Sequence, residues 1–276
     1  MSELLSLRET VEKYELLAKK SLGQNFLLDM NITDKIIRSS LEAQNKSDFN
    51  SHAVYEIGPG PGGLTRAILK AEPQLLTVIE MDSRCIQIMN EIREVYGDKM
   101  QIVEGDALKY DFLQSCTFPK DIVSNLPYNI SVPLLLSWLK NMKHFSSLTL
   151  MFQKEVAERI TAQPNSKSYG RLSVIAQITC KIKTLFNLNP NCFVPAPKIW
   201  STVLLFTPLE KIPAPEIMQK VERITELAFG QRRKMLRQSL KSIPDLDKLC
   251  DRVGIEPTRR AENISPEQFL ALAELI

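Results

Sequence analysis

The sequence predicts an α/β fold, in which a mainly parallel, doubly wound sheet of about seven strands is followed by a small domain made only of helices. Two observations predict the sheet. Short apolar segments alternate with segments of helical periodicity as far as residue 207, and a glycine-rich turn follows the first apolar strand. A third observation gives the second domain, because only helical periodicity remains after the proline-rich stretch "FTPLEKIPAPE". We therefore place the two domains at residues 1–207 and 208–276.

The individual elements follow from hydrophobic spacing. The expected strands are the short apolar runs, which lie at 53–57, 75–79, 100–104, 121–125, 147–152, 181–188 and 201–206. Two helices near the N-terminus are marked by apolar residues at helical intervals, namely Leu4, Leu7, Val11 and Tyr14, and then Ile32, Ile36, Ile37 and Leu41. Further helices are expected at 64–71, at 83–95 with Asp82 or Ser83 as N-cap, and after Pro133.

Composition excludes several classes of protein. The chain is 44% hydrophobic and 24% charged, as is usual for a globular protein, and no apolar run approaches the roughly 20 residues that a membrane span needs. Acidic residues near the N-terminus argue against a signal or transit peptide. The five cysteines form no CxxC pair and are odd in number, and there are only two histidines. We therefore expect no metal site, no disulfide framework and no membrane contact, and a reducing cytoplasm as the location.

Basic residues are concentrated in one segment, although the net charge of +3 alone identifies no partner. Residues 229–241, "FGQRRKMLRQSLK", hold five basic residues and no acidic one. On a single helix, Arg233, Arg237 and Lys241 would share a face. Smaller clusters lie elsewhere, at Lys19, Lys20, Lys167 and Arg171. Each cluster is either an ordinary solvated surface or part of a surface that binds phosphates.

The glycine-rich turn "EIGPGPGGL" indicates a nucleotide-type ligand. Gly58, Gly60 and Gly63 are in G-x-G-x-x-G register between a strand and a helix, which is the Rossmann-like arrangement. Glu80 ends the next strand, where a ribose hydroxyl would need a carboxylate acceptor. No G-K-[ST] follows, so the turn is not a P-loop. The turn alone would serve NAD, a flavin or S-adenosylmethionine, or would have only a structural role.

Two further strand ends narrow this choice. Asp106 follows the third strand, and the fourth strand ends in "NLPY", Asn125 to Tyr128. The exocyclic amine of adenine is a poor nucleophile, and two hydrogen-bond acceptors can favour a pyramidal nitrogen whose lone pair faces a methyl donor. The Asn125 side-chain oxygen and the Leu126 carbonyl are two such acceptors, with Pro127 fixing the direction of that carbonyl. Tyr128 offers a flat face for an unpaired or flipped base.

With these motifs, the sequence resembles the ribosomal RNA adenine N6-dimethyltransferases, and the resemblance runs from about Lys19 to the C-terminus. It rests on "SLGQNFLLD", "EIGPGPGGLT", "VIEMD", "VEGDAL", "SNLPYNIS", "MFQKEVAERI", "FVPAPKIWSTV", "FGQRRKMLRQSL" and "GIEPTRRAENIS". The last two motifs are similar to the branch that modifies small-subunit rRNA. The implied fold is a Rossmann-like S-adenosylmethionine-dependent methyltransferase domain with a helical RNA- and ribosome-binding domain. A monomer is also implied.

The resemblance also implies roles for individual residues. S-adenosyl-L-methionine would be the cofactor, contacted by Asn25, Leu27, Gly58, Gly60, Glu80, Asp106 and Asn125. Glu80 would hold the ribose and Asp106 the adenine amine of the cofactor. Phe193 would stack on the flipped base opposite Tyr128, completing a catalytic set with Asn125, Leu126 and Pro127. The RNA-binding residues would be Arg232, Arg233, Lys234 and Arg237.

The implied reaction adds two methyl groups to each of two adjacent adenines near the 3′ end of 16S rRNA, in an immature small ribosomal subunit. Two other functions remain compatible with part of the sequence. An NAD-type oxidoreductase would share the glycine turn and Glu80 but would leave "NLPY" and the basic segment unexplained. An RNA-binding assembly factor without enzymatic activity could keep the whole fold, although the intact acceptors at Asn125 and Leu126 argue against it.

Overall fold

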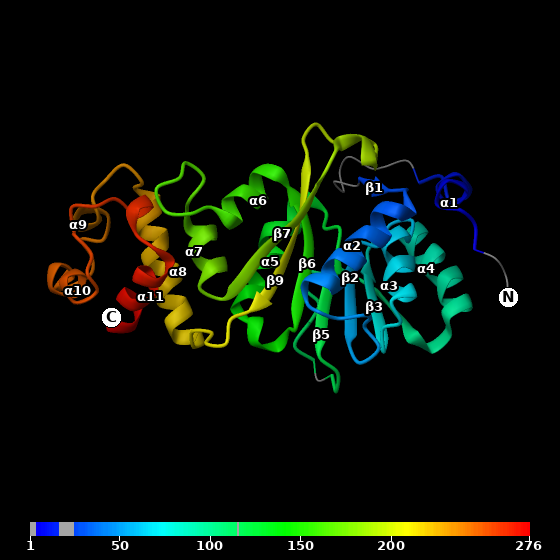
Figure 1. Cartoon of the computed structure of the whole chain (residues 1–276), viewed down its shortest axis with the longest axis horizontal. Helices are drawn as coiled ribbons and strands as arrows, with labels where there is room; N and C mark the ends of the chain where they lie inside the picture. The colour runs from blue at the N-terminus through cyan, green and yellow to red at the C-terminus, as the bar shows by residue number, and fades with distance from the viewer. Residues whose placement is uncertain (1–3, 17–24, 115) are drawn as a thin grey trace. The chain divides into compact units, whose positions relative to one another are not determined.

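The computed structural model describes residues 4–16, 25–114 and 116–276. Its centre is a seven-stranded sheet with the order β4-β3-β2-β5-β6-β9-β7 (Figure 1). The strands are β2 (Ala53–Ile57), β3 (Leu75–Glu80), β4 (Met100–Glu104), β5 (Lys120–Ser124), β6 (Ser147–Gln153), β7 (Cys180–Leu188) and β9 (Ser201–Pro208). Neighbouring strands from β4 to β6 are parallel, and β9 runs antiparallel to β6. All seven predicted strands are confirmed, with their ends displaced by at most two residues.

A second, two-stranded sheet was not predicted. It pairs β1 (Phe26–Leu27) with β8 (Phe193–Val194), so that Leu27 lies opposite Phe193. Each strand has only two residues, which is too short for an alternation of apolar and polar residues to mark it. This pairing joins the N-terminal "GQNFL" arm to the "FVPAP" segment.

Parallel strands that are buried along their length need helices packed on them, and α3 (Gly63–Lys70) and α4 (Ser83–Tyr96) both pack on β3. The other α-helices described before residue 180 are α1 (Leu7–Lys13), α2 (Met30–Ala43), α5 (Tyr128–Lys140), α6 (Lys154–Thr161) and α7 (Arg171–Gln177). Asp82 is the N-cap of α4, because its carboxylate accepts from the Arg84 N–H at 3.1 Å. Strands β2 and β5 are buried along their whole length, and the core around them includes Phe26, Leu27 and Phe193.

The predicted start of one helix was wrong. Helix α5 begins at Tyr128, five residues before Pro133, which lies inside it. The first turn of the helix closes before Pro133 is reached. The Ile130 N–H donates to the Pro127 carbonyl at 3.1 Å, and Ser131 Oγ donates to the Tyr128 carbonyl at 2.9 Å. Proline therefore removes one helical hydrogen bond here but does not set the boundary.

The chain separates into two compact units. The first comprises residues 1–135, 144–154 and 183–207, and the second 136–143, 155–182 and 208–276. One boundary falls between Thr207 and Pro208, where the sequence places its domain boundary, but the second unit also takes in two segments from before it. Beyond residue 208 the helices are α8 (Pro215–Gly230), α9 (Leu236–Ser239), α10 (Leu246–Arg252) and α11 (Pro266–Leu275). Across the described residues, no helix combines the length and apolarity that a membrane span demands.

Candidate active site

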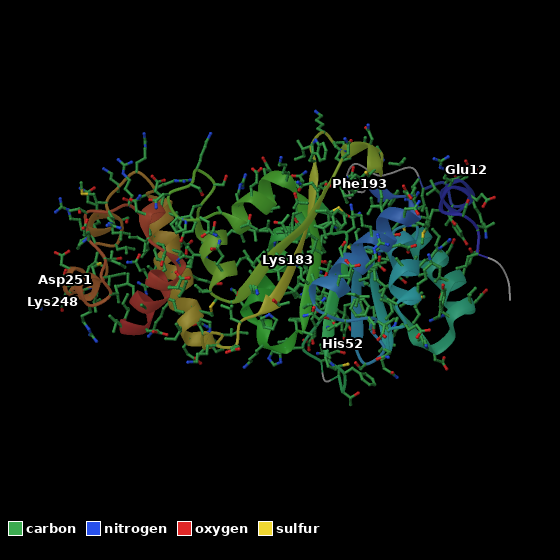
Figure 2. All side chains as sticks on the ribbon, in the orientation of Figure 1. Glu12, His52, Lys183, Phe193, Lys248 and Asp251 are labelled. Atoms are coloured by element: carbon green, nitrogen blue, oxygen red, sulfur yellow. The ribbon has the colours of Figure 1, made fainter. Side chains whose placement is uncertain are left out.

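A cavity lies in the first unit, at the carboxyl ends of β2, β3, β4 and β5. In an open parallel sheet this edge is where ligands bind. The cavity is lined by the sequence-predicted residues Asn25, Leu27, Gly58, Gly60, Glu80, Asp106, Asn125, Leu126, Pro127 and Tyr128. Figure 2 shows Phe193 near one end of the sheet and His52, which precedes β2, near the opposite end. The structure thus brings together all the predicted cofactor-binding residues and the four residues of "NLPY".

The glycine turn and the N-terminal arm are packed directly on each other. Gly58 and Gly60 have φ values of +64° and +55°, and residues with a side chain rarely adopt such positive angles. A Cβ on Gly60 would lie 2.9 Å from two ring carbons of Phe26, and one on Gly63 would lie 2.9 Å from the Leu27 carbonyl oxygen. Glycine is therefore required here for a second reason, because the arm that carries Asn25 and Leu27 occupies the space a side chain would fill.

Glu80 is an acceptor held in place by the backbone. Its Oε1 accepts from the N–H groups of Met81 at 2.7 Å and Asp82 at 2.9 Å, and the Gly60 N–H helps to lower the pKa of the carboxyl. The side chain is only 8% exposed, and burial raises the pKa of this carboxyl although the three N–H groups act in the opposite direction. A buried acceptor of fixed orientation at the end of β3 suits a pair of ribose hydroxyls.

Asp106 lies just beyond β4, where its Oδ1 accepts from the Leu108 N–H at 2.9 Å. That hydrogen bond fixes the direction of the carboxylate. Two exposed apolar side chains, Met81 and Leu108, lie on the lining of the same cavity, at 62% and 49% exposure. An apolar flank beside a fixed carboxylate is a suitable environment for a planar base that carries an amino group.

Glu56 was missed by the sequence analysis. It lies within β2, is 2% exposed, and lines the cavity beside the glycine turn. Thr65 Oγ1 donates to its Oε2 at 2.7 Å. Burial raises the pKa of Glu56 to about 8, and the nearby charge of Glu80 adds to this shift. The available signal was an acid inside the otherwise apolar run "AVYEI", where a carboxyl is rare unless it has a role.

The "NLPY" residues continue from the end of β5. Ser124 Oγ donates to the Ile57 carbonyl at 2.8 Å, which ties this end to β2. Asn125 Nδ2 donates to the Asn25 carbonyl at 3.2 Å, so the arm engages the amide nitrogen and leaves Oδ1 as the acceptor. Tyr128, the first residue of α5, forms a hydrogen bond through its hydroxyl to Ser201 Oγ at 2.8 Å, and burial raises its pKa. Ser201 had no sequence signal, because it meets Tyr128 only through the pairing of β9 with β6.

Phe193 does not line the cavity. It is 2% exposed, pairs with Leu27 in the small sheet, and belongs to the hydrophobic core. Its stacking on a flipped base stays a prediction. In this structure its ring supports the arm.

The basic segment is not a single helix, so the predicted shared face of Arg233, Arg237 and Lys241 was wrong. Helix α8 ends at Gly230, and α9 begins only at Leu236. Between them Met235 is extended and bridges to Arg260, while the Leu236 N–H donates to the Arg259 carbonyl at 2.8 Å. Pairing with the "PTRR" segment thus takes these residues out of the helix. The inward orientation of Leu236 and Leu240 is confirmed, since both are 0% exposed.

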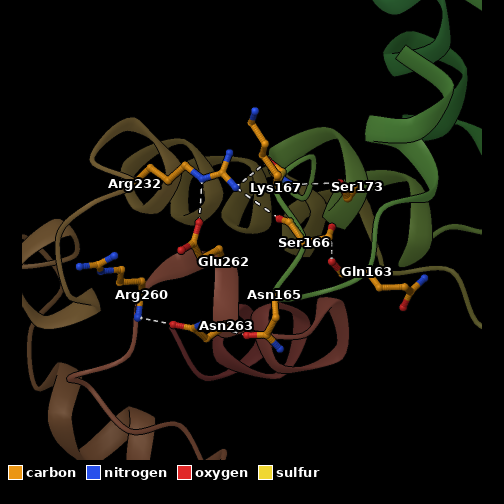
Figure 3. Close-up of polar contacts among 10 residues, drawn as sticks. Gln163, Asn165, Ser166, Lys167, Ser173, Arg232, Arg260, Glu262 and Asn263 are labelled. Carbon is orange, nitrogen blue, oxygen red and sulfur yellow. Dashed lines mark hydrogen bonds and ion pairs between the residues drawn. The ribbon is translucent and has the colours of Figure 1, made fainter. Parts of the chain in front are cut away.

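Arg232 differs from the other predicted RNA-binding residues (Figure 3). Its Nε donates to Glu262 Oε2 at 2.9 Å, and its NH2 donates to the Lys167 carbonyl at 2.8 Å and the Ser166 carbonyl at 3.4 Å. Arg232 therefore links a loop to the C-terminal helices. The exposed members are Arg233, Lys234 and Arg237. The expected cluster at Lys19 and Lys20 lies outside the described residues.

Comparisons with known proteins agree with this geometry. The family model described as ribosomal RNA adenine dimethylase matches residues 15–276. A protein of Rhodospirillum rubrum named ribosomal RNA small subunit methyltransferase A is 46% identical over 270 residues, covering 98% of this chain and 92% of the relative. A protein of the same name from Brucella abortus biovar 1 is 48% identical over 280 residues, covering 99% of this chain and 98% of the relative.

Two solved structures share the fold. A dimethyladenosine transferase from Plasmodium falciparum has a TM-score of 0.72 at 26% identity, covering 88% of this chain and 94% of that chain. The 23S rRNA methyltransferase ErmE has a TM-score of 0.69 at 22% identity, covering 91% and 98%, and supports the fold alone. With a family model that spans nearly the whole sequence and relatives close to half identical, the chain belongs to the ribosomal RNA adenine dimethylase family.

Proposed function

We propose that this protein transfers methyl groups from S-adenosyl-L-methionine to the N6 amines of two adjacent adenines near the 3′ end of 16S rRNA, during assembly of the small ribosomal subunit. One observation carries the proposal: Asn125 and Leu126 line the same cavity as Glu80 and Asp106. In this proposal the cofactor and the target amine bind at one edge of the sheet. The family, and the names of relatives that cover nearly the full chain, support the choice of rRNA adenines.

The residues of the cavity fit S-adenosylmethionine. The glycine turn lines the cavity, Glu80 is fixed as an acceptor for ribose hydroxyls, and Asp106 lies beside apolar side chains that suit an adenine ring. When bound, the cofactor supplies a methyl group made electrophilic by the sulfonium to which it is attached. Transfer to nitrogen then requires mainly alignment and electrostatic complementarity.

The acceptors at Asn125 and Leu126 orient the adenine amine. The Asn125 amide is fixed because its Nδ2 donates to the Asn25 carbonyl, so Oδ1 accepts one amine N–H. The Leu126 carbonyl accepts the other, and Pro127 restricts Leu126 to extended backbone conformations. In the unmethylated amine both N–H groups are engaged, which favours a pyramidal nitrogen whose lone pair is localised toward the methyl donor. The once-methylated amine keeps one N–H, which one of the two acceptors then engages.

Tyr128 provides the face on which the target base rests. Its hydroxyl is held by Ser201 at 2.8 Å, which fixes the ring at the edge of the cavity. A base can reach this position only when it is unpaired or flipped out of a helix. We expect Arg233, Lys234 and Arg237 to bind rRNA phosphates. We also expect the protein to act as a monomer in the cytoplasm, where its ribosomal substrate is assembled.

The test is transfer of labelled methyl groups to small subunits that lack the modification, with large subunits, tRNA and DNA in parallel, followed by mapping of the labelled base. We expect label on two adjacent adenines of the small-subunit rRNA. Label confined to another substrate would contradict the proposed substrate. Tight binding of small subunits without any transfer would instead identify a non-enzymatic assembly factor.

A further inference from the structure

Large apolar side chains are exposed together in one segment, residues 194–200. Val194 is 52% exposed, Ile199 37% and Trp200 46%. Isolated exposed apolar residues are ordinary, but three within seven positions are a feature to explain. The segment also contains Pro195 and Pro197. Because each proline fixes its own φ angle, the segment presents these side chains from a restricted backbone.

The topology places the backbone of Trp200 next to a residue that contacts the target-base site. Trp200 directly precedes Ser201, which pairs with Gln153 at the carboxyl end of β6. Ser201 is also the residue whose hydroxyl meets Tyr128 at 2.8 Å. The Trp200 carbonyl accepts from the Lys154 N–H at 2.8 Å, which fixes the backbone at this point. An exposed indole thus stands next in the chain to a residue that contacts the ring of the target site.

Two exposed lysines lie close to Trp200 along the backbone. Lys198 lies two residues before it, and Lys154 is joined to it by the backbone hydrogen bond. Within the described part of the chain, neither lysine has an ion-pair partner. Single-stranded nucleic acid is held by exposed aromatic faces together with unneutralised cations, because the bases stack on the rings while the cations bind phosphates. An apolar protein partner would not need the two charges.

We propose that Trp200, with Lys154 and Lys198, forms a stacking site for an unpaired nucleobase adjacent to the target adenine. The inference rests on the proposed function, since it concerns the RNA that enters the same site. Stacking of the neighbouring base would hold the strand in register while one adenine occupies the site at Tyr128. Loss of such a stacked base should weaken RNA binding roughly 5- to 150-fold.

The chain offers a direct optical probe of this site. It has two tryptophans, and Trp138 is 1% exposed whereas Trp200 is 46% exposed. Single-stranded hexaadenylate should therefore quench the fluorescence of Trp200 in the full-length protein and leave that of Trp138 unchanged. In Trp200→Phe the quenching should disappear while the oligonucleotide, followed by the anisotropy of an attached dye, still binds. Binding of hexaadenylate to the wild type without quenching would overturn the proposal.

Methylation of unmodified small subunits gives the second measurement. Trp200→Ala should raise the KM for subunits or lower kcat/KM by roughly 5- to 150-fold, with S-adenosylmethionine affinity unchanged. Trp200→Phe should restore most of the loss, because it keeps a stacking face. Leu113→Ala is the matched control, since Leu113 is 42% exposed in the first unit but far along the chain from this site. It should behave as the wild type.

The outcomes separate this inference from the proposed function. If the wild type methylates rRNA adenines and Trp200→Ala is equally active, the stacking site is wrong and the proposed function stands. If the wild type methylates no adenine but hexaadenylate still quenches Trp200, the proposed function is wrong and the base-binding site stands. A third outcome is that Trp200→Ala methylates subunits poorly, Trp200→Phe does not restore activity, and hexaadenylate does not quench the wild-type fluorescence. The segment would then contact a ribosomal protein, and the inference would be overturned.

Discussion

Glu56 makes the stability of the protein depend on pH in a direction opposite to that of most carboxylates. The group is 2% exposed, and burial raises its pKa to about 8 in the folded protein, against an ordinary value of 4.5. In the unfolded chain it is therefore ionised above about pH 4.5, whereas in the folded protein it keeps its proton until about pH 8. Since the folded state binds more protons in this window, its stability falls as pH rises from about 4.5 to about 8.

The size of the effect follows from the width of this window. When the folded state binds one proton more than the unfolded state, the free energy of unfolding falls by on the order of 1 kcal/mol per pH unit. Between pH 5 and pH 8 the free energy of unfolding therefore falls by about 3 kcal/mol. Glu56→Gln removes the titration and keeps an oxygen that can accept from Thr65 Oγ1. The difference in unfolding free energy, variant minus wild type, should therefore grow by about 3 kcal/mol across the same range.

Urea unfolding at pH 5, 6, 7 and 8, without cofactor and at constant ionic strength, measures this difference. The raised pKa of Glu80 is present in both proteins, so its direct contribution largely cancels. Glu104→Gln makes the same chemical change at an exposed position on β4 and serves as the control. If the wild type and Glu56→Gln give parallel stability curves from pH 5 to pH 8, Glu56 is ionised in the folded protein and the argument from burial is refuted.

Three further predictions concern binding and turnover. Asn125→Ala should lower methyl transfer by a factor on the order of 10²–10³, because an oriented acceptor of the amine is removed; single-turnover rates with small subunits test this, and wild-type rates would exclude the mechanism. Glu80→Ala should weaken S-adenosylmethionine binding by about 1–3 kcal/mol, measured by calorimetry, since a charged acceptor is removed; unchanged affinity would show that the carboxylate contacts no ligand. Arg233→Glu with Arg237→Glu should weaken binding to small subunits and flatten its salt dependence, by roughly 0.7–0.9 in log–log slope for each phosphate that the variant no longer binds. The control is Lys248→Glu, at an exposed lysine elsewhere in the same unit. If the double variant binds small subunits normally across a salt series, Arg233 and Arg237 are only solvated.

The strands were predictable because their signal is local. A short apolar run between turn residues is typical of a buried strand. The parallel sheet does bury β2 and β5 along their whole length. The order of the motifs then placed Glu80, Asp106 and Asn125 at one edge, since parallel strands bring their carboxyl ends together. The start of α5 was not predictable, because it depends on how residues 127–131 close a turn.

Some residues around the cavity are positioned by contacts between distant parts of the chain, and no local sequence pattern predicts such contacts. Phe26 packs on Gly60 across 34 positions in the sequence, and β1 is a strand only because β8 pairs with it. Ser201 reaches Tyr128 through the register of β9 on β6. A two-residue strand or a single serine has no periodicity. Only the folded chain shows which residues they meet.

The basic segment shows why charge in sequence is a weak guide to binding. Arg232 and Arg233 are neighbours of the same type, yet the first is engaged by Glu262 and by two backbone carbonyls while the second is exposed. A guanidinium that already holds three acceptors would have to give them up to bind a phosphate, and its loss would free the loop at residues 166–167. We therefore propose that Arg233, Lys234 and Arg237 bind RNA in this unit, and that Arg232 keeps the adjoining loop in place.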